Sequence, residues 1–119
     1  MKRAEIWTVA GANDYPGKPR PVVIVQDDQF DVTASITVCP LTTNPTDAPL
    51  LRLPVQPSEG NGLREACRLM VDKITTVPRA KVGKQIGQLA PGDMGRLNRA
   101  LLVFLGIAAP NKADQLERS

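Results

Sequence analysis

The chain has 119 residues, of which 42% are hydrophobic, and its 15 Lys and Arg against 12 Asp and Glu give a formal net charge of +3. This length and hydrophobic fraction predict one folded domain and exclude a disordered chain, while the modest positive charge favours an acidic partner. No apolar run is long enough for a membrane span or for a signal peptide, so we expect a cytoplasmic protein with no membrane contact.

The first half of the chain is cut by prolines and glycines into short apolar segments, a pattern typical of β-proteins. Alternation predicts a strand over Glu5–Ala10, and the β-branched run Pro21–Gln26 predicts a strand that is buried on both faces. A third strand is expected over Thr33–Leu41. A short edge strand is expected over Leu50–Val55, weakened by Pro54.

The second half predicts one more strand and one helix. Arg68–Thr76 has the composition of a strand, whereas Pro78–Gln88 is mixed and its two glycines limit any helix there. The helix begins at Pro91, which suits the first helical position, and Gly106 is its expected stop. Five apolar residues recur between them at helical spacing and predict one buried stripe: Met94, Leu97, Leu101, Phe104 and Leu105.

These elements predict four to six short strands followed by one packing helix. Such a chain folds as a small, curled antiparallel sheet or a partly open barrel. We expect the domain to cover residues 1–109, with a polar, disordered tail over 110–119.

The chain has no histidine, which removes the commonest general base and the commonest metal ligand. Asp, Glu and Cys form no cluster with metal-site spacing, so we expect neither a metal nor a cofactor. Cys39 and Cys67 lie among apolar residues, which indicates two buried, reduced thiols. Any catalysis must therefore use Arg, Lys, Asp, Glu, Ser, Thr or Tyr.

Charged, amide and hydroxyl side chains stand beside or within three of the predicted strands, where a rigid sheet can aim them at a ligand. In chain order they are Lys18, Arg20, Thr42, Thr43, Asn44, Asp72 and Lys73. The planar guanidinium of Arg20 suits two phosphate oxygens, and threonine hydroxyls can donate to the same oxygens. From composition alone, a solvated arginine and turn-forming threonines are the simpler interpretation.

Two carboxylates have ambiguous environments. Asp72 follows an apolar run, so it either faces solvent or is buried and paired with Lys or Arg. Glu5 opens the first strand, where it could block a sheet edge or lie near Arg20.

Four segments share their order and spacing with a known family: KRAEIWTV, GKPRPVVIVQDD, TVCPLTTN and VDKITTVPRAKVGKQIGQLAPGDMGRLNRALLVFLGI. From Lys2 to about Ile107 the chain resembles the MazF/PemK toxin endoribonucleases of bacterial toxin–antitoxin pairs, although Ala4 replaces the family's usual glycine. The resemblance implies a mainly β fold with a C-terminal helix, an SH3-like small β-barrel that usually forms a homodimer. It also implies a cognate antitoxin and metal-independent, sequence-specific cleavage of single-stranded RNA, whether mRNA, tRNA or rRNA.

The resemblance also assigns roles to residues. The family's catalytic arginine falls on Arg20 and its catalytic Thr or Ser on Thr42, while Glu5 and Asp72 fall on acidic positions and become candidate bases. The implied chemistry is attack of the RNA 2′-hydroxyl on the adjacent phosphorus, which leaves a 2′,3′-cyclic phosphate and a 5′-hydroxyl. The expected RNA contacts are Lys18, Thr43, Asn44 and Lys73.

Two other functions remain open for this fold. A toxin of the CcdB kind inhibits DNA gyrase and carries its function at the end of the helix, where PNKADQLERS offers no clear counterpart. A non-catalytic RNA-binding barrel would bind RNA without cutting it.

Overall fold

The computed structural model describes residues 1–10 and 18–109, and in that part of the chain it contains seven strands and one α-helix. The strands are β1 (Glu5–Val9), β2 (Arg20–Ile24), β3 (Ser35–Thr42), β4 (Arg52–Val55), β5 (Cys67–Met70), β6 (Thr75–Pro78) and β7 (Val82–Gln88). The helix is α1 (Pro91–Phe104), and three short 3-10 turns are η1 (Asp28–Phe30), η2 (Val71–Lys73) and η3 (Arg79–Lys81). The tail expected over 110–119 lies outside the described residues.

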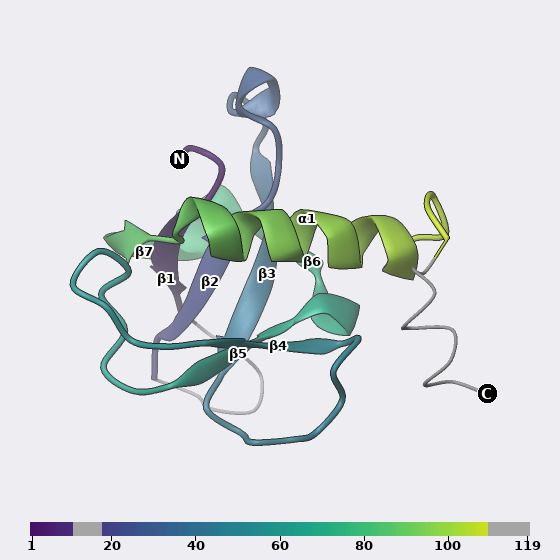
Figure 1. The fold of residues 1–119 in the computed structure, drawn as a ribbon. Helices are drawn as coiled ribbons and strands as arrows, with labels where there is room; N and C mark the ends of the chain where they lie inside the picture. The colour runs from purple at the N-terminus through teal and green to yellow at the C-terminus, as the bar shows by residue number, and fades with distance from the viewer. Residues whose placement is uncertain (11–17, 110–119) are drawn as a thin grey trace.

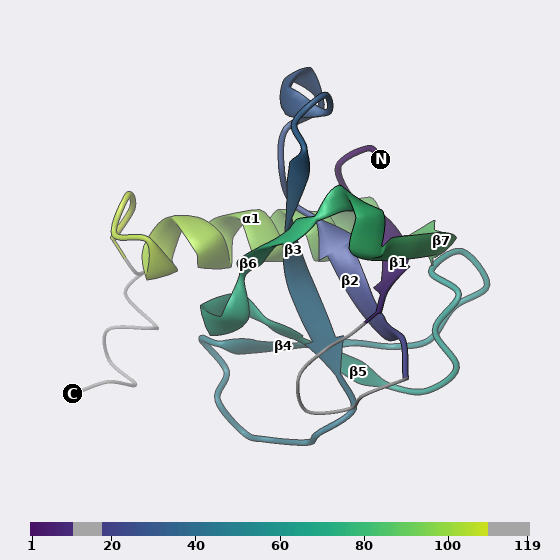
Figure 2. The same cartoon turned by 180° about the vertical axis from the view of Figure 1, so that it is seen from behind.

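All strand pairs are antiparallel, in the order β4-β5-β3-β2-β1-β7. On the side away from β2, β3 is long enough to pair with two strands, β6 along its first half and β5 along its second. Helix α1 crosses one face of the sheet (Figure 1), and the β6–η3–β7 segment crosses the other (Figure 2). This confirms a mainly β, barrel-like fold with a C-terminal helix.

Strand alternation divides the buried residues into two cores. The first lies between the sheet and α1 and includes Ile6, Val23, Cys39, Leu41, Met94, Leu97 and Leu101. The second lies on the opposite face and consists of Val9, Val22, Ile24, Ile36 and Val38. Pro21–Gln26 was expected to be buried on both faces, and its central residues Val22, Val23 and Ile24 are.

The segment from residue 67 to residue 88 differs from the sequence expectation. The single strand predicted over Arg68–Thr76 is two strands, because η2 turns the chain from the second half of β3 to its first half. The mixed segment Pro78–Gln88 contains β7, one of the longer strands. Its glycines permit close packing: a Cβ at Gly83 would lie 2.5 Å from Thr8 Oγ1, and one at Gly87 would lie 2.3 Å from a backbone carbon of Asn61.

Helix α1 begins at Pro91, as predicted, and Gly106 follows it with a positive φ of 76°. Met94, Leu97 and Leu101 are buried, but Phe104 and Leu105 are exposed, so the apolar stripe is shorter than predicted. The reason is the width of the sheet, because the last turn of the helix projects beyond the strands that it covers (Figure 1).

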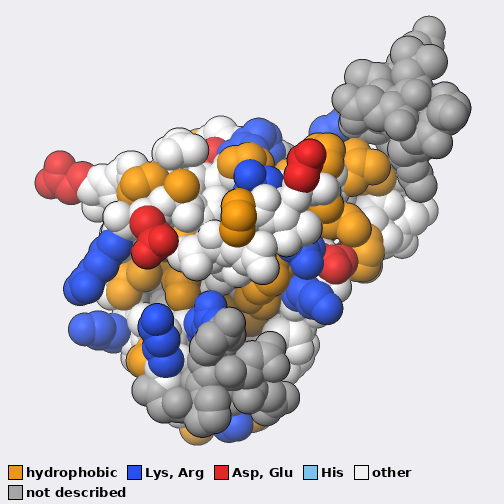
Figure 3. Space-filling view, turned by 90° about the horizontal axis from the view of Figure 1, so that it is seen from below, with side chains coloured by type: hydrophobic (Ala, Val, Ile, Leu, Met, Phe, Trp, Pro, Cys, Tyr) orange, Lys and Arg blue, Asp and Glu red, His pale blue; other side chains and the backbone are white. Residues whose placement is uncertain are grey.

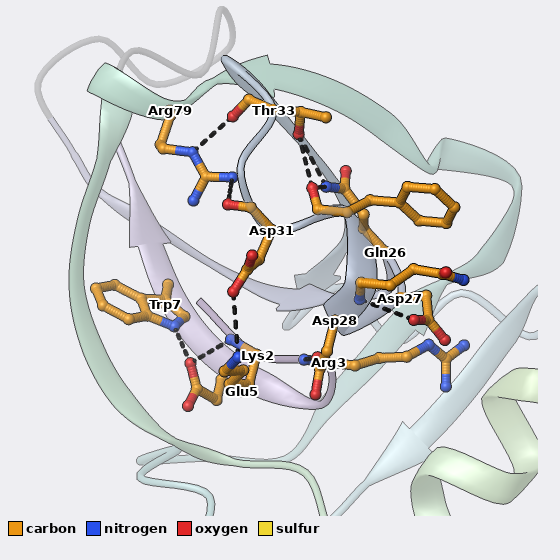
Figure 4. A network of polar contacts seen from close by, with 12 residues as sticks. Lys2, Arg3, Glu5, Trp7, Gln26, Asp27, Asp28, Asp31, Thr33 and Arg79 are labelled. Atoms are coloured by element: carbon orange, nitrogen blue, oxygen red, sulfur yellow. Dashed lines mark hydrogen bonds and ion pairs between the residues drawn. The ribbon is translucent and has the colours of Figure 1, made fainter.

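The chain before β1 and the β2–β3 hairpin hold one another in place (Figure 4). Lys2 Nζ forms an ion pair with Asp31 Oδ2 at 3.1 Å, and the Arg3 amide donates to Asp28 Oδ1 at 2.7 Å. Ala4 then adopts a positive φ of 77°, a conformation that favours glycine. The part of the chain that the structure describes has no helix of the length and apolarity that crossing a membrane requires.

Candidate functional site

A hollow of about 1080 Å³ opens on the face of the sheet opposite α1, between the ends of several strands. Six of the eight residues that the sequence predicted for the site line it: Lys18, Arg20, Thr42, Thr43, Asn44 and Lys73. Its apolar walls include Val22, Val38 and Val77 of the second core. The folded sheet therefore brings together residues that are more than 50 positions apart in sequence.

Arg20 and Thr42 stand at the adjoining ends of two neighbouring strands, Arg20 at the start of β2 and Thr42 at the end of β3, and both line the hollow. The register of β2 and β3 pairs Val22 with Pro40, and its extension by two residues sets Arg20 opposite Thr42. Because side chains alternate along a strand, both point to the same face as Val22 and Val38. Directly opposed residues in an antiparallel pair have Cβ atoms about 5 Å apart, so their side chains can contact one small group together.

A hydrogen-bonded turn fixes Thr42. Its Oγ1 accepts from the Asn44 amide at 3.1 Å, so the hydroxyl proton remains available to donate. Asn44 Oδ1 accepts from both the backbone amide and the hydroxyl of Thr46, at 3.1 and 2.8 Å, which leaves the side-chain nitrogen of Asn44, Nδ2, to donate elsewhere. Arg68 Nη1 donates to the Thr46 carbonyl at 2.8 Å and ties this turn to β5.

The hollow is positively charged. Four cations line it, namely Lys18, Arg20, Lys73 and Lys81, and no carboxylate belongs to the described residues of the lining. Figure 3 shows Lys and Arg side chains gathered on this side of the molecule. A phosphate-bearing or otherwise acidic ligand fits such a surface.

The structure does not bring Glu5 to Arg20. Glu5 pairs with Gln88 at one end of β1, whereas Val9 at the other end pairs with Arg20, about 13 Å along the strand. The Glu5 carboxylate instead accepts from Trp7 Nε1 at 3.0 Å and from the Lys2 amide at 2.8 Å (Figure 4). Nor does Glu5 block an edge, because β1 lies between β2 and β7.

Asp72 also lies outside the lining, although its neighbour Lys73 belongs to it. Its Oδ1 accepts from Arg52 Nη1 in an ion pair whose two side chains are 25% and 15% exposed. Of the two environments that the sequence left open for Asp72, solvent-facing or paired, the structure shows the paired one. The pair joins η2 to the start of β4 and so helps to hold the corner that carries Lys73.

Two contributions to the site, and one to the loop beside β7, were not found from the sequence. Lys81 was expected to be merely solvated, and Arg68 was seen only as the start of a strand. Asn61 is 4% exposed and locks the loop beside β7: its Oδ1 accepts from the Ser58 and Leu63 amides at 2.9 Å, and its Nδ2 donates to the Gln56 carbonyl. No local pattern marks the roles of Lys81 and Arg68, because both depend on segments that are distant in sequence.

Both cysteines are buried and unpaired, as expected. Burial raises the pKa of the Cys39 thiol to about 12, although a contact with the Met70 carbonyl at 3.5 Å opposes part of that shift. Burial also raises the pKa of Cys67. Neither thiol is therefore suited to act as a nucleophile. Within the described residues, no three His, Cys, Asp or Glu side chains gather to hold a metal ion.

The comparisons with known proteins agree on one family. The family described as PemK-like, MazF-like toxin of type II toxin-antitoxin system matches residues 2–105. The chain is 56% identical over 108 residues to the probable endoribonuclease MazF of Mycolicibacterium smegmatis, which covers 91% of this chain and 99% of that protein.

Solved structures share the fold. An endoribonuclease in complex with its cognate antitoxin from a mycobacterial species superposes with a TM-score of 0.76 at 23% identity, over 92% of this chain and 99% of that one. The Mycobacterium tuberculosis toxin MazF-mt6 gives a TM-score of 0.69 at 26% identity, over 82% of this chain and 92% of the toxin.

Proposed function

The chain belongs to the PemK-like, MazF-like toxin family of type II toxin–antitoxin systems, and we propose from this premise that it is an endoribonuclease toxin that cuts single-stranded RNA at a short sequence without a metal ion. The observation that carries the proposal is that Arg20 and Thr42, at the adjoining ends of β2 and β3, line the same cationic hollow. This arrangement and the family favour a nuclease over a gyrase inhibitor or a passive RNA-binding barrel.

The chemistry follows from where these donors point. When the RNA 2′-hydroxyl attacks the adjacent phosphorus, negative charge grows on the phosphate oxygens, and the 5′ oxygen of the next nucleotide leaves. The Arg20 guanidinium and the Thr42 hydroxyl are placed to donate to these oxygens, so they supply the positive charge and hydrogen bonds that a metal supplies elsewhere. Water takes the proton of the 2′-hydroxyl and returns one to the leaving 5′ oxygen, so the products are a 2′,3′-cyclic phosphate and a 5′-hydroxyl.

The two carboxylates play lesser parts in this proposal. Glu5 is bonded to Trp7 at the far end of β1, so it does not receive the 2′-hydroxyl proton. Asp72 acts through Arg52 as a positioning residue for the corner that carries Lys73. Lys18, Thr43, Asn44 and Lys73 contact RNA, the lysines through phosphates and the Asn44 amide through an exposed base edge.

The same hollow accounts for inhibition. A solved relative is described as bound to its cognate antitoxin. For this chain we propose an antitoxin with an acidic segment that occupies the hollow and competes with RNA for its four cations. We also propose that the toxin is a homodimer that acts in the cytoplasm.

The test is cleavage of a long single-stranded RNA in EDTA, with the new 5′ ends mapped and their chemistry determined. We expect cuts at one recurring short sequence, and we expect Arg20→Ala to abolish them. Arg99→Ala, an exposed arginine on α1, is the matched control and should cut normally. Intact RNA with folded, antitoxin-free wild type, or full cleavage by Arg20→Ala, would refute the proposal.

A further inference from the structure

Lys73 and Lys81 lie on opposite sides of the Arg20–Thr42 pair. Val9 pairs with Arg20 on one side and with Val82 on the other, and the Ala10 amide donates to the Lys81 carbonyl at 3.0 Å. Lys81 therefore lies on the β7 side of Arg20, about two strand spacings or 10 Å away along the sheet.

Lys73 lies beyond Thr42, in the other direction. β3 pairs Leu41 with Leu69 and Val38 with Thr75, so the η2 corner that carries Lys73 faces the residues between them, Cys39 and Pro40. Both lysines line the hollow. They flank β6, one at each end, which favours contacts with two different phosphates over contacts with one.

These two lysines also differ from most cations of the fold in what they contact. Lys2, Arg52 and Arg96 form ion pairs with carboxylates, whereas the side chains of Lys73 and Lys81 make no hydrogen bond or ion pair within the described part of the chain. Their donors remain available to a ligand that enters the hollow.

We propose that Lys81 and Lys73 bind the two RNA phosphates on either side of the scissile one, so that the strand crosses the hollow from β7 to η2. This inference rests on the proposed function, because it takes the Arg20–Thr42 pair as the place of the scissile phosphate. It adds Lys81 as an RNA-binding residue and gives the substrate a defined path: three successive phosphates, with only the middle one at the reacting pair.

The first test measures binding of a short RNA that contains the mapped cleavage sequence, with a 2′-deoxy nucleotide at the cleaved position. Fluorescence anisotropy at several salt concentrations gives the Kd and its salt dependence. We expect Lys81→Gln and Lys73→Gln each to weaken binding by about threefold to tenfold and to reduce the slope of log K against log salt by about 0.7. Lys84→Gln removes an equally exposed lysine of β7 that does not line the hollow, and it should change neither value.

The second test assigns each lysine to one phosphate. Single phosphate linkages of the same RNA are replaced by neutral methylphosphonates, and the Kd of each modified RNA is measured for wild type and for each lysine variant. When the linkage on one side of the scissile phosphate is neutral, Lys81→Gln should no longer raise the Kd. When the linkage on the other side is neutral, Lys73→Gln should no longer raise the Kd. If both lysines couple to one linkage, or neither couples to any, or Lys84→Gln matches them, the proposed path is wrong.

Cleavage of the all-ribose RNA by wild type separates this inference from the proposed function. Cleavage without the two couplings overturns only the path. If wild type cuts no RNA, the nuclease is overturned, and the same salt series on a generic single-stranded RNA tests the two lysines by themselves. A smaller slope in both variants keeps the two phosphate contacts, and an unchanged slope overturns them too.

Discussion

Thr42→Val tests whether the hydroxyl in the hollow has a catalytic role. Valine keeps the β-branched shape of threonine at the end of β3, so the sheet should fold as before. The substitution removes two things: a hydroxyl that can donate to the phosphate, and an oxygen that accepts from the Asn44 amide at 3.1 Å.

Loss of the acceptor affects the stability of the fold, whereas loss of the donor affects the rate of cleavage, and the two effects differ in size. Asn44 is exposed, so water can take the place of the lost acceptor, and the free energy of unfolding should fall by less than about 1 kcal/mol. Loss of one preorganised donor to a developing oxyanion costs about 2.7 to 4 kcal/mol in the transition state, or about 100-fold to 1000-fold in rate. Thr42→Ser keeps both functions and should stay within about tenfold of wild type.

The assay is single-turnover cleavage of a short fluorescent RNA at saturating enzyme, with urea unfolding of each variant in parallel. Saturation removes differences in binding, so the rate constant reports the chemical step. A Thr42→Val variant that folds normally and cleaves within about threefold of wild type would show that the hydroxyl does not stabilise the transition state.

Four further outcomes follow from the structure. Asn61→Ala should lower the free energy of unfolding by about 3 kcal/mol in urea, because three hydrogen bonds at a buried side chain are lost; a change below about 1 kcal/mol would contradict this. Ala4→Gly should raise stability by up to about 1 kcal/mol and Ala4→Val should lower it, since φ is positive there; the opposite order would refute the strain. Glu5→Gln should leave single-turnover cleavage within about threefold of wild type, and a loss near that of Arg20→Ala would make it a base after all. The thiol pKa of Cys39 is raised to about 12 in the folded protein, so its contribution to stability is complete below about pH 8.5 and declines as pH rises toward 12; Cys39→Ala should flatten the decline in urea unfolding between pH 8 and 10.

Local pattern was enough for some of the elements and for choosing the pair that we propose reacts. The β-branched run after Arg20 and the helical spacing after Pro91 each reflect the burial of one continuous segment, so the sequence alone locates β2 and α1. Arg20 and Thr42 could be chosen because each stands at the end of a predicted strand and each matches the family in type.

The tertiary structure decided which of the remaining charged residues share the hollow. Glu5 and Arg20 stand on neighbouring strands, yet antiparallel register sets them at opposite ends, while Lys81 enters the lining through η3. The sequence could not show this, because register and curvature depend on pairings between segments that are far apart in the chain. The same is true of Gly87. In the sequence it indicates only that a helix is disfavoured, but in β7 its missing side chain leaves room for the backbone of Asn61.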